Sequence, residues 1–157
     1  MKYLFILFPL FSISCNETKT TKNNYTSINK TDLNKAQWIT GNWKSTYEGK
    51  PFFEYYDLIN DSTLKILSYE WDGKDTSKTS LSFLSFKNGA YFLGDSMNWK
   101  ATAINDREIK MIPVYKANNE IHWKFISLNK WEAILKGASK TNTYVMERIP
   151  LIDSLMK

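Results

Sequence analysis

The sequence predicts an all-β fold, an antiparallel up-and-down β-barrel of about 8 to 10 strands with a short helix before it. Beyond Trp38, aromatic and β-branched residues alternate with polar ones in short runs, a pattern typical of half-buried strands. Turn-forming residues interrupt these runs at fairly even spacing, and no helical segment is long enough to connect parallel strands. A sheet of this size must close or fold over, because an open sheet exposes its edges.

A closed barrel is favoured over a two-sheet sandwich, because a sandwich needs longer connections and the chain shows few of them. With 43% hydrophobic and 15% aromatic residues, roughly 120 folded residues can bury the core of one domain. A single cysteine among 157 residues leaves no disulfide to help. We expect the barrel domain to span residues 31–149 and a C-terminal tail to follow at 150–157.

The N-terminal 14 residues have the layout of a secretory signal peptide. Met1-Lys2 gives a positive start, and the apolar run YLFILFPLF follows without interruption from Tyr3 to Phe11. A transmembrane helix would need about 18 or more apolar residues, and this run is shorter. We therefore expect residues 1–14 to direct export and to be removed.

The lone cysteine, Cys15, follows this segment directly. The stretch Ser12-Ile13-Ser14-Cys15 resembles a bacterial lipobox, although Ser12 stands where leucine is usual. The resemblance implies cleavage before Cys15, a diacylglycerol on its thiol and acylation of the new amino terminus. Two or three chains hold a protein stably on a membrane, whereas one chain is marginal. We expect a lipoprotein of the bacterial cell envelope, facing the periplasm or on the outer membrane; the alternative is a plain thiol inside a discarded signal.

We expect residues 15–30 to form a flexible lipidated linker between the membrane and the domain, because NETKTTKNNYTSINK is polar and has no apolar period. A short helix is expected next, at residues 31–38. Thr31 is a candidate N-cap and Asp32 supplies an acidic first turn. Leu33, Ala36 and Trp38 could dock this helix on the barrel, and without docking it would be too short to persist.

The strand pattern is clearest in three stretches. Asn88-Gly89 separates LSFLSF from AYFLG and predicts a two-residue hairpin. In EIHWKFIS, the residues Ile121, Trp123 and Phe125 fall on one face of a strand. KWEAILKG alternates in the same way. The alternation predicts one face toward a core and one toward solvent.

The stretch WITGNWK begins the first predicted strand and carries a Gly-x-Trp motif at Gly41 and Trp43. With the helix before it and the meander after it, the chain resembles the calycin superfamily, the lipocalins and fatty-acid-binding proteins. In lipocalins an arginine near the end of the last strand lies across this tryptophan, and Arg148 is the matching residue. The resemblance implies a barrel closed by its first and last strands; the alternative makes Trp43 ordinary core and Arg148 a surface charge.

Two departures from that superfamily concern a lid over the barrel. Lipocalins have a long loop between their first two strands, and fatty-acid-binding proteins place two helices there. This chain has only the short segment 48–51, EGKP. The disulfide common in lipocalins is also missing. These two departures argue against a deep, lidded lipid cavity.

No set of residues in the sequence predicts catalysis. His122 is the only histidine, so a site with several histidine ligands is excluded, and we expect neither a metal nor a cofactor. No Gly-x-Ser-x-Gly elbow or phosphate-binding glycine loop is present. Glu70 with Asp72, and Asp57 with Asp61, are local carboxylate pairs, which at strand ends are usually solvated. We expect a protein that is not an enzyme; a hydrolase using His122 remains the third alternative.

The formal net charge is +5, and it becomes +4 if Lys2 leaves with the signal peptide. The lysines are scattered over turns and outer faces rather than clustered in a stripe. A scattered charge favours solubility and a mild attraction to anionic headgroups. It does not predict a nucleic-acid partner.

The aromatic content points to the barrel interior, with six Trp, nine Tyr and nine Phe. A wide barrel leaves room for one ligand, whereas bulky side chains fill a small one. We therefore expect a small hydrophobic or amphipathic ligand inside the barrel; the alternative is a filled barrel that contacts another protein through its outer face. The residues expected to line the interior are Tyr55, Ile66, Phe83, Tyr91, Met111, Trp123, Phe125, Trp131 and Val145.

Overall fold

The computed structural model describes residues 27–71 and 76–150. The predicted signal peptide, Cys15, most of the predicted linker and nearly all of the predicted tail lie outside these residues. Within them, no helix has the length and apolarity needed to cross a membrane.

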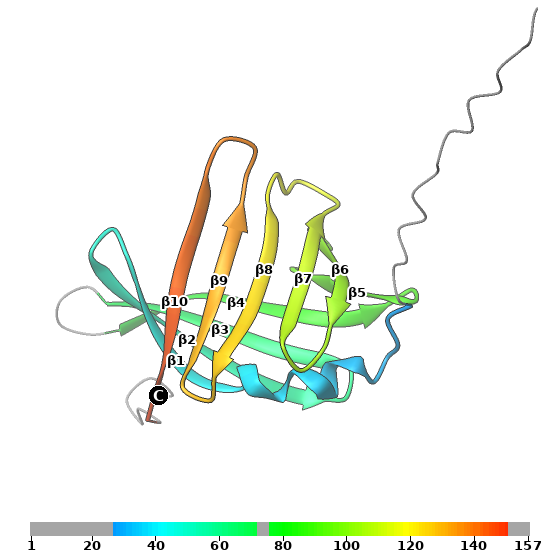
Figure 1. Ribbon diagram of the computed structural model, residues 1–157, viewed down its shortest axis with the longest axis horizontal. Coiled ribbons are helices and arrows are strands. Elements are labelled where there is room, and N and C mark those ends of the chain that lie inside the picture. The colour runs from blue at the N-terminus through cyan, green and yellow to red at the C-terminus, as the bar shows by residue number, and fades with distance from the viewer. Residues whose placement is uncertain (1–26, 72–75, 151–157) are drawn as a thin grey trace, which may run out of the picture.

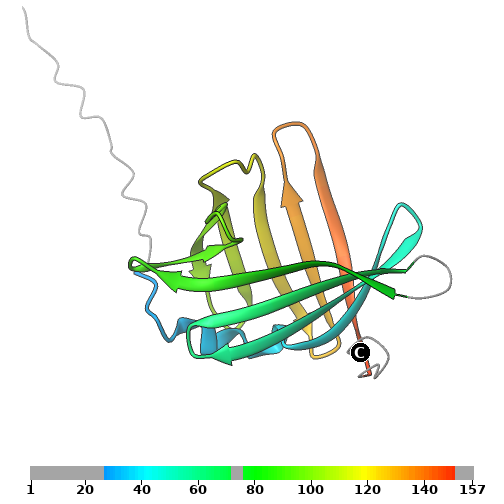
Figure 2. The same ribbon diagram turned by 180° about the vertical axis from the view of Figure 1, so that it is seen from behind.

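Ten antiparallel strands form one closed barrel, which confirms the predicted fold class (Figure 1). Each strand pairs with its neighbour in the chain, and the last pairs with the first. Figure 2 shows β2, β3 and β4 crossing steeply in front of the strands on the far wall. The elements are η1 (Asp32–Ile39), β1 (Gly41–Tyr47), β2 (Lys50–Asn60), β3 (Thr63–Trp71), β4 (Thr76–Lys87), β5 (Ala90–Leu93), β6 (Trp99–Ile104), β7 (Glu108–Pro113), β8 (Glu120–Ser127), β9 (Lys130–Lys136) and β10 (Thr141–Ile149).

Two hairpins of the barrel use turns with both central residues at positive φ. Asn88 and Gly89, between β4 and β5, have φ of 50° and 79°, and Glu48 and Gly49, between β1 and β2, have the same values. These angles are those of a type I′ turn, whose twist matches that of the flanking strands. The predicted Asn88-Gly89 hairpin is confirmed, and the short turn at Glu48 leaves no long loop over this end of the barrel.

Four irregularities in strand pairing help the sheet to curve. The register shifts between Leu58 and Asn60, between Ser68 and Tyr69, between Ala101 and Ala103, and between Phe125 and Ser127. An extra residue bends its strand and increases the local twist. Such bends let ten strands close on themselves instead of folding into two sheets.

The barrel closes where β1 pairs with β10. Trp43 lies opposite Arg148 in this pairing, and Asn42 lies opposite Ile149. The sandwich alternative is therefore not the fold of this chain. A closed antiparallel barrel with a helix before its first strand is compatible with a lipocalin-like fold.

The predicted helix is present as a 3₁₀ helix, η1, which lies across one end of the barrel at the bottom of Figure 1. Its Leu33, Ala36 and Ile39 side chains are buried. Thr31 occupies the predicted N-cap position, but its side chain makes no capping hydrogen bond. Instead Asp32 accepts a hydrogen bond of 2.8 Å from the backbone N–H of Asn29, since its carboxylate faces back toward the preceding turn.

Candidate functional site: a cavity in the open half of the barrel

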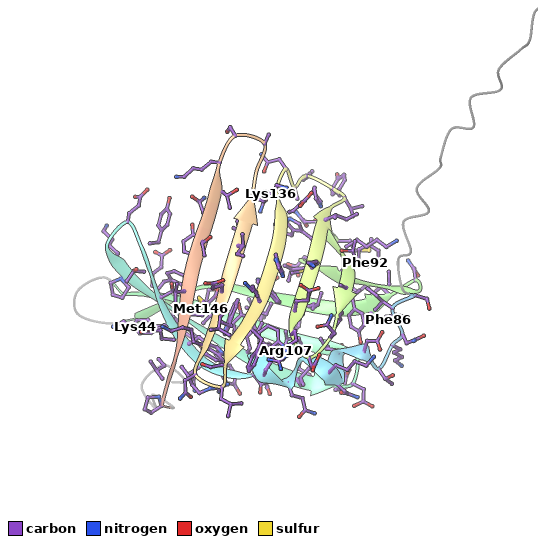
Figure 3. All side chains as sticks on the ribbon, in the orientation of Figure 1. Lys44, Phe86, Phe92, Arg107, Lys136 and Met146 are labelled. Atoms are coloured by element: carbon purple, nitrogen blue, oxygen red, sulfur yellow. The ribbon has the colours of Figure 1, made fainter. Side chains whose placement is uncertain are left out.

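The half of the barrel away from η1 contains a cavity of about 720 Å³. Lys136 lies at the free end of β9, and Arg107 lies at the opposite end beside η1 (Figure 3). The lining residues come from the β1–β2 hairpin and from six further strands, β3, β4, β5, β8, β9 and β10. They are Tyr47, Glu48, Lys50, Pro51, Phe52, Glu54, Tyr56, Ile66, Ser68, Tyr69, Glu70, Ser82, Leu93, Ile121, Trp123, Ala133, Leu135, Tyr144 and Met146.

Strand alternation places these side chains inside. On β2, every second residue from Phe52 through Glu54 to Tyr56 lines the cavity. Paired residues in an antiparallel sheet share a face, and Tyr56 pairs with Ile66 on β3. The cavity wall is therefore set by the register of β2 against its neighbours.

A carboxyl group, that of Glu54, lies inside the barrel. Its Oε2 accepts a hydrogen bond of 2.6 Å from the hydroxyl of Tyr56, and its Oε1 accepts one of 3.2 Å from Ser68. Removal from water raises the pKa of Glu54, and the two hydrogen bonds lower it by less. The same burial, together with the neighbouring carboxyl, raises the pKa of Tyr56 well above its usual value. The pair is thus an acidic, hydrogen-bonded spot in a largely apolar wall.

The mouth of the cavity carries two further acidic side chains, Glu48 and Glu70, and one basic side chain, Lys50. Tyr144 stands among them, edge-on to Phe52 with ring centroids 5.8 Å apart. The ring of Tyr47 also lies near that of Tyr144, with centroids 6.1 Å apart. The entrance is therefore aromatic with an acidic rim.

The opposite end of the barrel is closed by Trp43, Arg148 and η1. The indole N–H of Trp43 donates a 2.7 Å hydrogen bond to the carbonyl of Ile39, at the end of η1. The guanidinium carbon of Arg148 lies 4.2 Å from the centroid of the Trp43 ring. This guanidinium also donates to the carbonyls of Thr40 at 2.9 Å, Trp38 at 3.2 Å and Leu128 at 2.7 Å. One side chain thus joins the helix, the β8–β9 turn and the last strand.

Gly41 lets these groups meet. Its φ is +111°, and a Cβ atom on it would lie 2.5 Å from Nη1 of Arg148. A side chain at this position would be strained and would displace the guanidinium. Gly41, Trp43 and Arg148 are therefore brought together at the closed end, about the Gly-x-Trp motif.

Six of the residues expected to line the interior face inward. Ile66 and Trp123 line the cavity. Tyr91, Met111 and Trp131 are fully or almost fully buried in the core beyond it, and Phe125 packs on Trp38 at the closed end, with ring centroids 5.7 Å apart. The interior is thus filled at one end and hollow at the other.

Three expected lining residues, Tyr55, Phe83 and Val145, lie on the outer face, and that part of the prediction is wrong. Tyr55 lies beneath the ammonium group of Lys65, 5.5 Å from its ring centroid, and Phe83 pairs with Lys65. Val145 is 42% exposed. In each of these strands the adjacent residues face the interior instead. The prediction therefore assigned the inward face to positions one residue away from the correct ones.

Sequence reasoning missed Glu54, Tyr56, Tyr144 and Met146 as lining residues. On β2, FFEYYDL has apolar or aromatic residues on both faces, so alternation alone cannot choose between them. On β10, alternation allows either Tyr144 and Met146 or Val145 to face inward, and the sequence does not decide between the two. The Glu54 carboxylate had no sequence signal, because charged residues are usually assigned to the surface.

The groups considered for catalysis lie apart from the cavity or at its rim. His122 lies on the outer face of β8, where its Nε2 is 2.9 Å from Oε2 of Glu108. Asp57 pairs with Lys65 on the outer face, and Glu70 is at the mouth; Asp72 lies outside the described residues. In the described part of the chain, no three His, Cys, Asp or Glu side chains come together to hold a metal ion.

Comparison of the chain with protein-family models, with curated proteins and with solved structures finds no match in any of the three.

Proposed function

We propose that this protein binds a small hydrophobic or amphipathic ligand inside its barrel. The observation that carries the proposal is the cavity of about 720 Å³, which falls within the roughly 300–1,000 Å³ of ordinary ligand pockets. Its wall is mostly apolar and aromatic, with a few converging polar groups at Glu54 and its neighbours. The likeness to calycins at Gly41, Trp43 and Arg148 supports the same function by analogy of fold.

A bulky side chain in the wall tests this function. Ala133 lines the cavity between its strand partners Trp123 and Tyr144, so Ala133→Trp projects an indole into the space. Ile134, the next residue, lies on the outer face, and Ile134→Trp is the matched control. We expect wild type and Ile134→Trp to bind the neutral dye Nile red with increased emission, and Ala133→Trp to bind it at least about tenfold more weakly. Equal binding by all three folded proteins would show that the dye does not use the cavity.

The alternative function is a protein contact through the outer face. The outer surface of β2, β3 and β4 carries several apolar side chains beside the Asp57–Lys65 ion pair, and Leu81 among them is 41% exposed. Its members are Phe53, Tyr55, Leu67, Leu81 and Phe83. This function predicts that wild-type protein binds neutral dye no better than Ala133→Trp does.

We propose further that the barrel acts while anchored to a membrane of the bacterial cell envelope through lipidated Cys15. The support is the sequence pattern of residues 1–15. Replacing Cys15 with Ser should move the protein from the membrane fraction to the soluble fraction of its host, measured by fractionation and immunoblotting. Retention of the Ser variant in membranes would exclude lipidation as the anchor.

A further inference from the structure

The presence of the Glu54 carboxylate in a mostly apolar cavity wall is energetically costly and calls for an explanation. Removing a carboxylate from water costs several kcal/mol unless partners replace the water. Glu54 is half-buried in such a position, inside the barrel beside Ile66, Trp123 and Met146 in the cavity wall. A glutamine or a leucine would serve the packing of this wall at a lower cost, so the carboxylate suggests a partner of its own.

The partners within the protein leave Glu54 incompletely satisfied. Each of its oxygens accepts one hydrogen bond, one from Tyr56 and one from Ser68, whereas the two oxygens of a carboxylate offer about four lone-pair sites. No ion pair joins Glu54 to a lysine or arginine whose side chain the structure describes. Both hydrogen bonds come from neutral hydroxyl groups, so among the described side chains no positive charge lies against the carboxylate.

The charge of the cavity wall is opposite to that of the chain. The chain as a whole has a net charge of +5, but the described wall holds three glutamates, at 48, 54 and 70, and one lysine, at 50. A cleft whose low-dielectric walls carry mainly charges of one sign focuses the field and concentrates ligands of the opposite sign. The cavity is thus built to favour a cation in an otherwise basic protein.

Aromatic rings surround this carboxylate. Tyr56 and Trp123 meet edge to face with centroids 5.7 Å apart, and Phe52 and Tyr144 line the wall toward the mouth. The faces of such rings attract ammonium groups, most strongly where water is excluded. A carboxylate beside several aromatic rings suits an ammonium head better than an alcohol or a carboxylate head.

We propose that the ligand is an amphipathic amine whose protonated nitrogen binds Glu54 and whose apolar body lies against the aromatic wall. This inference rests on the proposed function, since it names the chemical class of the ligand of the same cavity. The ammonium supplies the hydrogen bonds and the charge that Tyr56 and Ser68 do not. A volume of about 720 Å³ limits the body to the size of a drug-like molecule or a medium-length alkyl chain.

Three probes with one apolar body test the inference: 1-naphthylmethylamine, 1-naphthylmethanol and 1-naphthoate. Their affinities for the wild-type protein are measured by calorimetry at neutral pH and low salt. We expect the amine to bind at least about tenfold more tightly than the alcohol, because hydrogen bonds to charged groups contribute more than neutral ones, and the naphthoate to bind most weakly. Glu54→Gln should bring the amine down to the affinity of the alcohol and leave the alcohol almost unchanged.

Glu70→Gln is the matched control, because it removes the same charge from the mouth of the cavity and leaves Glu54 in place. We expect it to keep most of the preference for the amine. An equal loss in Glu70→Gln and Glu54→Gln would overturn the assignment to Glu54. The wild-type comparison needs no variant: if the alcohol binds as tightly as the amine, or the naphthoate binds most tightly, the inference is wrong while the proposed function stands. If neither Nile red nor any of the three probes binds, the proposed function fails, and the inference fails with it.

Discussion

At the scale of single residues, the closed end of the barrel is held by tightly packed side chains. Trp131 shows the density of packing there: its ring meets those of Trp38, Trp43, Tyr56 and Trp123 with centroids 5.6–6.2 Å apart. Its indole N–H is buried and finds no hydrogen-bond acceptor in the described part of the chain. Trp43, in contrast, has both a hydrogen bond and a guanidinium on its face.

A methyl group at Gly41 tests how closely this end is fitted. Gly41→Ala should lower the free energy of unfolding by about 2–4 kcal/mol, because it adds strain at positive φ and displaces Arg148 from its carbonyl partners. Gly49→Ala is the control, since Gly49 also has a positive φ, +79°, but open space around its Cβ position. It should cost only about 1 kcal/mol. Chemical denaturation measures both, and equal costs would mean that the approach of Arg148 to Gly41 contributes no stability.

At the scale of the elements, η1 is held by Asp32 rather than by the residue that precedes it. Lys35 hydrogen-bonds the Asp32 carboxylate at 2.8 Å, and the backbone N–H of Asn29 does so at the same distance. These bonds, that of Lys35 first, lower the pKa of Asp32. Thr31 has a helical backbone but no side-chain bond to η1.

Two alanine variants separate these roles. Asp32→Ala should cost about 1–2 kcal/mol, because the backbone N–H of Asn29 and the ammonium of Lys35 both lose their acceptor. Thr31→Ala should change stability by less than about 0.5 kcal/mol, as is usual at an exposed position without such a bond. Thermal unfolding followed by far-ultraviolet circular dichroism gives both values. A larger loss of stability in Thr31→Ala would show that the Thr31 side chain does cap the helix.

The turns of the barrel could be predicted from the sequence, whereas the inward faces of some strands could not. A type I′ turn needs two residues that tolerate positive φ, and Asn-Gly is the preferred pair. Asn88-Gly89 therefore predicted a hairpin from local sequence alone. The face of a strand is different when both faces are apolar. On β2 the choice between Tyr55 and Tyr56 is made by pairing with β1 and β3, and a shift of one residue moves every side chain to the other face.

At the scale of the whole molecule, the barrel combines a packed end with a hollow end. The sequence predicted the closed barrel, because alternation, short turns and the lack of crossing helices are all local signals. It could not decide between a filled and a hollow interior, since that depends on which of many aromatic residues face inward. Nor could it place Glu54 inside, because only the register of β2 takes a charged residue there.

The pH dependence of unfolding sums opposing contributions over this whole barrel. Partial burial raises the pKa of Glu108, but the hydrogen bonds and charges of Lys110 and His122 outweigh burial and lower it. A lowered pKa adds stability above the unfolded value of 4.5, and this stability is lost as the pH falls through the folded value. Glu54 has the opposite sign, because burial raises its pKa. Its contribution is fully present below 4.5 and is lost as the pH rises through the folded value.

Glu54→Gln should therefore stabilise the ligand-free barrel at neutral pH, by an amount that shrinks as the pH falls toward about 4, where the wild-type carboxyl is itself protonated. Gln keeps the size of the side chain and an acceptor for the Tyr56 hydroxyl, so packing changes little. Glu108→Gln should show the reverse, a loss of stability at neutral pH that disappears only as the pH falls below 4.5 and through the lowered folded pKa of Glu108. Urea denaturation of the three proteins at neutral pH, near pH 4 and at a pH well below 4 measures these differences. If Glu54→Gln is less stable than wild type at neutral pH, then the carboxylate is needed to hold the fold together, and its place in the cavity needs no ligand to explain it.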